Sequence, residues 1–132
     1  MNEYKFRGKR VDNGQWVYGF YREWTMPEIW KDRAYRDGIN YYIDEKGTNE
    51  SHLVIPETVG QYTGLHDKNG KEVYKGDIVI YGNKIAVVVW DDDTCSFKLK
   101  YKENLYNMWA ACEVIGNIHD NPELLKEGDT SE

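Results

Sequence analysis

The stretch Ile78–Trp90, which reads IVIYGNKIAVVVW, is the clearest structural signal in this chain. Two runs of β-branched and aromatic residues flank Gly82-Asn83, and a glycine that comes first in a two-residue loop suits a type II′ turn. The pattern therefore predicts a β-hairpin. Its second strand, Ile85–Trp90, is apolar on both faces, which is typical of a strand at the centre of a core.

The sequence that follows this hairpin predicts further strands. Asp91–Thr94 has the residues of a turn and leads into Phe97–Lys102, whose strict alternation indicates one buried face and one solvated face. We expect a loop or a single turn around Asn104–Trp109 and a last strand at Cys112–Ile118. These segments predict an antiparallel meander.

The N-terminal part of the chain predicts more hairpins. Tyr4–Arg7 alternates apolar and basic residues, and Asp12–Gly14 supplies turn residues before the aromatic run Trp16–Tyr21. Another strand is expected at Ile39–Ile43. Between these strands, Arg22–Arg36 is aromatic but aperiodic, so a helix and a hairpin both remain open there.

Two remaining signals complete the expected architecture. Val59–Gly64 predicts a short strand before a tight turn at Asp67–Lys71, and Asn121-Pro122 predicts a short helix with asparagine as the cap. Many short strands without an alternating βαβ pattern favour an antiparallel barrel or sandwich. We therefore expect an all-β fold, a small antiparallel barrel with N-terminal hairpins and a short C-terminal helix.

Length and composition set the expected organisation. A chain of 132 residues is in the range of one domain, which we place at residues 1–127, with a disordered tail at 128–132. No apolar run approaches the roughly 20 residues of a membrane helix, and the first residues lack the apolar stretch of a signal peptide. We therefore expect a cytoplasmic protein, in which Cys95 and Cys112 stay reduced and are buried as small hydrophobic residues.

The charge is unevenly distributed. The net charge of -6 disfavours a role in coating nucleic-acid duplexes, yet the first 36 residues carry a local excess of positive charge. Cations there alternate with aromatic residues, a pattern that can present charges and stacking faces to single-stranded nucleic acid. The alternative is that the cations form the solvated face of an edge strand. The candidate nucleic-acid-binding residues are Lys5, Arg7, Lys9 and Arg10.

A second group of residues indicates a protein interface. Tyrosine and tryptophan are abundant, with 11 and 5 copies, and both are enriched where proteins bind one another. Several fall in one short stretch, where they are either interface or packing residues. The candidate interface residues are Trp24, Trp30, Tyr35, Tyr41 and Tyr42.

Catalytic and metal-binding patterns are weak in this sequence. The segment from Gly64 to Gly70-Lys71-Glu72 has the wrong spacing for a phosphate-binding loop and lacks the hydroxyl after the lysine, so turn chemistry explains it better. Asp91–Asp93 has the oxygen atoms that hard cations prefer, but an acidic turn is the simpler interpretation. The histidines and cysteines lack the close pairwise spacing of a zinc site. We expect no catalytic residue, no metal and no cofactor, while an enzyme remains an alternative because sites assemble from distant residues.

Three segments of this sequence, Lys5–Gly19, Val54–Val79 and Glu113–Leu125, resemble the signature of the YopX family of small proteins encoded by bacteriophages and prophages. The central segment is the most specific. The resemblance implies an all-β fold in which the part from Gly76 onward is similar to an SH3-like barrel. It also implies a location in the cytoplasm of an infected or lysogenic bacterium, and it implies no activity.

These observations lead to one main functional hypothesis. We expect a non-enzymatic protein-interaction module whose partner is a phage protein, a host protein or a second copy of the chain. The alternative is a nucleic-acid-associated accessory factor that binds single strands through the basic and aromatic N-terminal strand. No membrane partner is expected.

Overall fold

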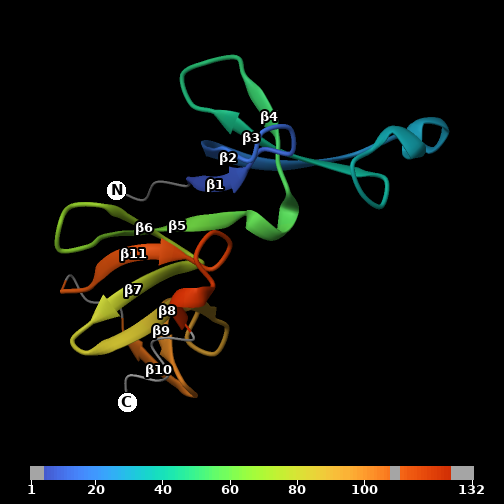
Figure 1. The fold of residues 1–132 in the computed structure, drawn as a ribbon. Coiled ribbons are helices and arrows are strands. Elements are labelled where there is room, and N and C mark those ends of the chain that lie inside the picture. The colour runs from blue at the N-terminus through green and yellow to red at the C-terminus, as the bar shows by residue number, and fades with distance from the viewer. Residues whose placement is uncertain (1–4, 108–110, 126–132) are drawn as a thin grey trace. The chain divides into compact units, whose positions relative to one another are not determined.

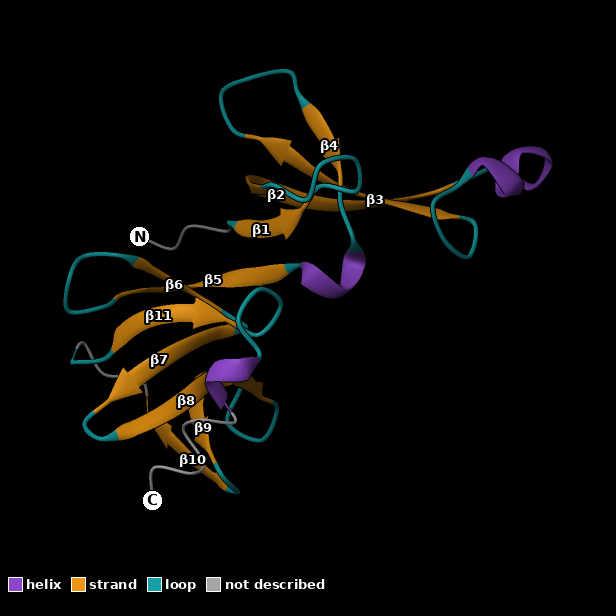
Figure 2. Cartoon of the chain, viewed as in Figure 1, coloured by secondary structure: helices purple, strands orange, loops and turns teal. Residues whose placement is uncertain are grey.

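The computed structural model describes residues 5–107 and 111–125, and it confirms the all-β prediction (Figures 1 and 2). The chain divides into two compact units. The N-terminal unit ends at Gln61 and the C-terminal unit begins at Tyr62, within strand β5 (Gly60–His66). No helix in the described residues is long and apolar enough to cross a membrane.

The N-terminal unit is an antiparallel sheet in which β4, β3, β2, β1 and the start of β5 are neighbours in that order. The predicted first hairpin is confirmed, because β1 pairs with β2. The stretch that the sequence left open continues β2 as far as Thr25 and then forms a short 3-10 helix, η1. The elements are β1 (Phe6–Lys9), β2 (Trp16–Thr25), η1 (Glu28–Arg33), β3 (Ile39–Glu45), β4 (Ser51–Leu53) and η2 (Pro56–Thr58).

The segment after β4 returns to the end of β1. The backbone N–H of Val11 donates to the carbonyl of Leu53, and the N–H of Ile55 donates to the carbonyl of Lys9, both at 2.9 Å. The N–H of Lys9 also donates to the hydroxyl of Thr58 at 2.9 Å. These bonds bring residues 10–12 beside residues 51–53.

The apolar interior of the N-terminal unit is small. Ile43 and Val54 are fully buried, and Val54 packs against Gly8, where an added Cβ would lie 3.2 Å from it. The rings of Phe6 and Tyr21 lie 5.7 Å apart on the same side of the sheet. Few apolar side chains therefore hold this unit together.

Gly19 sets the register of β2 against β3. It pairs with Glu45, and a Cβ at this position would collide with the backbone carbonyl of Asp44. Only glycine permits this close approach, because every other residue carries a Cβ. The pairing then continues without interruption to Thr25 and Ile39.

The C-terminal unit consists of the remainder of β5, β6 (Glu72–Tyr74) and a five-stranded sheet in the order β10-β9-β8-β7-β11. The predicted hairpin is confirmed: Tyr81 pairs with Lys84, and Gly82 has the positive φ, 65°, that the turn needs. As expected, β8 lies between β7 and β9. The strands of the sheet are β7 (Asp77–Tyr81), β8 (Lys84–Asp91), β9 (Ser96–Tyr101), β10 (Asn104–Asn107) and β11 (Glu113–Asn117).

The core of the C-terminal unit is apolar and well enclosed. The predicted alternation of β9 is confirmed, because Leu99 and Tyr101 are buried while Lys100 is exposed. The other buried members of this cluster are Val73, Val79, Ala86, Val88 and Cys112.

Three expectations for the C-terminal unit need correction. Asn104–Asn107 is a strand and not a loop, because Lys102 adopts a positive φ of 55° that allows a tight turn back onto β9. Cys95 is exposed and not buried, since it lies in the turn between β8 and β9. The sheet is open, with β10 and β11 at opposite ends of the strand order and unpaired with each other in the described residues, so the barrel is not closed. The predicted tail, 128–132, lies outside those residues, as does Trp109.

Asp67 connects the turn after β5 to β11 within the C-terminal unit. Its carboxylate accepts hydrogen bonds from the backbone N–H groups of Asn69, Lys71 and Val114, at 2.9, 2.8 and 2.9 Å. Burial by itself would raise the pKa of Asp67, but these bonds outweigh it, and the pKa is lowered.

We predict that Gly19→Ala lowers the free energy of unfolding by about 3 kcal/mol or more, because the new methyl group collides with backbone that cannot move independently. Gly47→Ala is the control: Gly47 has a positive φ but open space around its Cβ position, so only backbone strain of about 1 kcal/mol is expected. Urea denaturation measures both. Equal losses for the two variants would contradict the role given to Gly19.

We predict that Asp67→Asn lowers the free energy of unfolding at pH 7 by about 2 kcal/mol, since a neutral amide accepts fewer of these hydrogen bonds. The folded-state pKa of Asp67 is lowered, so its stabilisation is present above the unfolded-state pKa and is lost as the pH falls through the folded-state pKa. The variant should therefore lose less stability than the wild type on acidification below about pH 4. Urea denaturation across the acid range measures this. An equal loss of the free energy of unfolding in the variant and the wild type on acidification would refute it.

Candidate functional site

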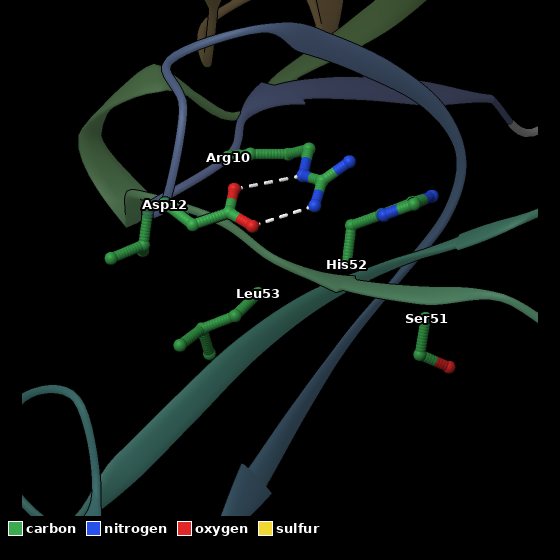
Figure 3. A pocket seen from close by; sticks show the side chains of 6 residues that line it. Arg10, Asp12, Ser51, His52 and Leu53 are labelled. Atoms are coloured by element: carbon green, nitrogen blue, oxygen red, sulfur yellow. Dashed lines mark hydrogen bonds and ion pairs between the residues drawn. The ribbon is translucent and has the colours of Figure 1, made fainter.

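The N-terminal unit contains a pocket of about 270 Å³ where residues 10–12 meet residues 51–53 (Figure 3). In Figure 3 the Arg10 and Asp12 side chains face each other, and the ring of His52 lies on the guanidinium side of the pocket. Ser51 and Leu53 point the other way, as alternation along a strand requires. The full lining is Arg10, Val11, Asp12, Ser51, His52 and Leu53.

Arg10 and Asp12 form a two-point ion pair in this pocket. Nε of Arg10 donates to Oδ1 of Asp12 at 2.9 Å, and Nη2 donates to Oδ2 at 2.6 Å. The hydrogen bonding raises the pKa of Arg10 and lowers the pKa of Asp12. One of the predicted nucleic-acid-binding cations therefore has an acidic partner within the chain.

His52, which lines this pocket, also lies beside two carboxylates. It is 8% exposed, and its Nε2 lies 3.0 Å from Oε1 of Glu45 and 3.6 Å from Oε1 of Glu50. One ligand-type atom from each of these residues lies within 4.8 Å of the others. We call Glu45, Glu50 and His52 the His52 cluster.

Sequence reasoning missed the His52 cluster because it sought histidine and cysteine pairs at close spacing. The signal was present in two other features. Glu50 and His52 are two residues apart, a spacing that puts both side chains on one face of an extended segment, and the polar residues between Glu45 and Ser51 return the chain beside Glu45. Strand pairing of Ile43 with His52 then completes the group.

Two of the other N-terminal cations, Arg7 and Lys9, pack against the ring of Trp16. Arg7 is 7% exposed, and its guanidinium carbon lies 4.7 Å from the centre of the Trp16 ring. Nζ of Lys9 lies 5.7 Å from the same ring, and Lys5 is half-buried. Such cation–π contacts hold the cations against the sheet.

Exposed aromatic side chains lie along one face of β2. Tyr18, Phe20 and Trp24 occupy alternate positions and are 44%, 52% and 46% exposed. We call these residues the aromatic face. Arg22 occupies the alternate position between Phe20 and Trp24, and its guanidinium carbon lies 4.3 Å from the centre of the Tyr42 ring. Of the aromatic face, sequence reasoning selected Trp24 alone and treated Tyr18 and Phe20 as hairpin residues.

The far half of β2 and the start of β3 form a two-stranded ribbon that ends at η1 (Figure 1). Pairing with β1 stops at Gly19, so among the described residues the β2 positions beyond it pair with β3 alone. At the tip, Ile29 is 79% exposed and Trp30 is 43% exposed.

The predicted interface residues fall into two groups. Trp24 and Trp30 are exposed, whereas the tyrosines are half-buried. The hydroxyl of Tyr42 accepts a hydrogen bond from Asn40 at 3.1 Å, and the ring of Tyr35 lies 5.2 Å from the guanidinium carbon of Arg36. The half-buried members are Tyr35, Tyr41 and Tyr42.

The remaining candidate metal ligands are dispersed. The acidic turn is confirmed: Asp91 accepts hydrogen bonds from the N–H of Asp93 at 3.1 Å and from the hydroxyl of Thr94 at 2.7 Å. His66 is exposed in β5 and His119 is half-buried after β11. Burial raises the pKa of the Cys112 thiol, which makes it less reactive.

Comparison with known proteins identifies a family and a fold. A family model described as YopX protein matches residues 5–126. The crystal structure of protein EF1440 from Enterococcus faecalis is similar to this chain with a TM-score of 0.52 and 22% sequence identity, covering 95% of this chain and 99% of that one. At this identity the similarity concerns the fold alone. No curated protein matches the sequence.

We predict that Trp24→Ala and Trp30→Ala each change the free energy of unfolding by less than about 1 kcal/mol, because both side chains are already largely in water. Ile43→Ala should lower it by about 2 to 5 kcal/mol, since Ile43 is fully buried. Chemical denaturation measures all three. A large loss in either tryptophan variant would show that its ring serves packing.

Proposed function

This chain belongs to the YopX family, as its sequence resemblance predicted, and we propose that it acts as a non-enzymatic protein-interaction module of a bacteriophage or prophage in the bacterial cytoplasm. The observation that carries this proposal is the aromatic face of β2.

We also propose that the C-terminal unit is an SH3-like variant opened between β10 and β11. The meander β7–β10, with β11 against β7, supports that assignment.

The exposure of the aromatic face favours a partner. Tyr18, Phe20 and Trp24 project from one strand and leave about half of each side chain in water. Contact with another apolar surface would recover roughly 25 cal/mol for each Å² removed from water. Tryptophan and tyrosine are also enriched among the residues that dominate protein–protein binding energy.

The ribbon adds a second argument. A two-stranded ribbon is marginally stable in water unless a further layer or strand supports it. From Phe20 to Thr25, the outer edge of β2 has no strand beside it in the described part of the chain. An extended segment of a partner could add to this edge by backbone hydrogen bonds and place apolar side chains on the aromatic face.

The nucleic-acid alternative has less support. Of the four predicted cations, Arg7 is buried against Trp16 and Arg10 is paired with Asp12, while Lys5 and Lys9 are half-buried. Asp44 and Asp12 also place acidic groups on this unit. A single strand would therefore meet few cations here, and few phosphate contacts give weak binding.

We predict that immobilised full-length protein captures a defined protein from lysed, phage-infected bacteria, or that light scattering detects a dimer. Trp24→Ala combined with Trp30→Ala should abolish the interaction, because it removes two exposed apolar contacts without affecting the core. Leu105→Ala is the matched control: Leu105 is 46% exposed in the C-terminal unit and should leave binding unchanged.

The same proteins test the alternative by fluorescence anisotropy with a labelled single-stranded oligonucleotide at low salt. Binding that is lost in Lys5→Glu with Lys9→Glu, and retained in the tryptophan double variant, would replace the proposal with the nucleic-acid function. A monomer that captures nothing, or a capture that the double variant leaves intact, would refute the role of the aromatic face.

A further inference from the structure

We propose that the His52 cluster is a binding site for a divalent transition-metal ion of the zinc class, with Nε2 of His52 and one carboxylate oxygen each from Glu45 and Glu50 as ligands. This inference rests on different residues from the proposed interaction surface. Of the three proposed ligands, His52 also lines the pocket of Figure 3, whereas Glu45 and Glu50 do not.

The distances suit a small tetrahedral ion. With metal–ligand bonds of about 2.1 Å, neighbouring ligand atoms of a tetrahedral zinc site are about 3.4 Å apart. The Nε2 atom of His52 lies 3.0 Å from the Glu45 oxygen and 3.6 Å from the Glu50 oxygen, on either side of that value. The three ligand atoms all lie within 4.8 Å of one another, so a small rotation of an exposed glutamate side chain brings them to one ion.

The backbone holds the ligands in place before an ion arrives. Glu45 is the last residue of β3. Its N–H donates to the carbonyl of Glu50 at 2.9 Å, which fixes the two ends of the loop between β3 and β4. Ile43 of β3 pairs with His52 of the neighbouring strand β4, so the imidazole lies on the buried face of the sheet, beside Glu45. The backbone positions of Glu45 and His52 are therefore fixed before binding, and the glutamate side chains only have to turn toward the ion.

Burial and exposure are divided in a way that suits ion entry. His52 is 8% exposed, whereas the side chains of Glu45 and Glu50 are 42% and 67% exposed. An ion can therefore reach the carboxylates from solvent and then contact the buried imidazole. Three protein ligands leave at least one coordination position for water or an external ligand.

The donor types select the class of ion. One imidazole nitrogen with two carboxylate oxygens suits Zn²⁺ and its neighbours in the first transition row, whereas Ca²⁺ and Mg²⁺ prefer oxygen atoms alone. Two carboxylates also match the charge of a divalent cation. Arg10 interacts electrostatically with Glu50, but the two bonds to Asp12 hold its guanidinium group.

We test the site by titrating tag-free, full-length Cys95→Ser protein with Zn²⁺ by isothermal calorimetry. The serine removes the exposed thiol as a competing ligand. We expect one equivalent of Zn²⁺ per chain, and an affinity about tenfold weaker or more in Glu45→Gln and in Glu50→Gln. Glu28→Gln is the matched control, since Glu28 is an exposed glutamate of the same unit paired with Lys31.

Two further measurements keep the test decisive if a variant folds poorly. Circular dichroism establishes that each glutamine variant retains the fold, and nuclear magnetic resonance of the Cys95→Ser protein detects the His52 ring directly when Co²⁺ is added. A selective shift of that ring by one equivalent of Co²⁺ supports the site. The absence of heat with Zn²⁺, or an equal Zn²⁺ affinity in all three glutamine variants, would overturn the proposal. His52 would then be a hydrogen-bonded residue of the sheet and no more.

Discussion

The close approach of Gly19 to the backbone of Asp44 is the constraint on which the N-terminal unit depends. It allows β2 to pair with β3 in one register from Gly19 to Thr25. Because side chains alternate along a strand, that register decides that Tyr18, Phe20 and Trp24 share a face. It also places Glu45 at the end of β3, beside His52. A slip of one residue would exchange the two faces and disperse both candidate sites.

The two units use their interiors differently. The C-terminal unit buries a continuous apolar cluster around Val79 and Leu99, and its buried Asp67 is satisfied by backbone N–H groups. The N-terminal unit has only two fully buried apolar side chains among the described residues, and it also encloses Arg7 and His52. Burying charged and titratable groups in so small an interior is unfavourable for stability, and such departures concentrate at functional sites.

Sequence patterns predicted most of the strands because their signals are local. The Gly82-Asn83 turn and the alternation of Phe97–Lys102 each depend on residues close together in the chain. The strand at Asn104–Asn107 escaped prediction because its turn uses Lys102 at a positive φ, a conformation that lysine seldom adopts. The His52 cluster and the aromatic face depend on register, which no local pattern specifies. Burial of Arg7 depends on its packing against Trp16 and is equally invisible in the sequence.

The exposed thiol of Cys95 has a practical consequence for work on this protein. It lies at a positive φ in the turn between β8 and β9, whereas the chain's other cysteine, Cys112, is buried. Air oxidation can therefore join two chains through Cys95 and produce a covalent dimer that has nothing to do with the aromatic face. Mass measurements need a reducing agent to separate the two. The same thiol offers a single attachment point for a fluorophore or spin label on the C-terminal unit.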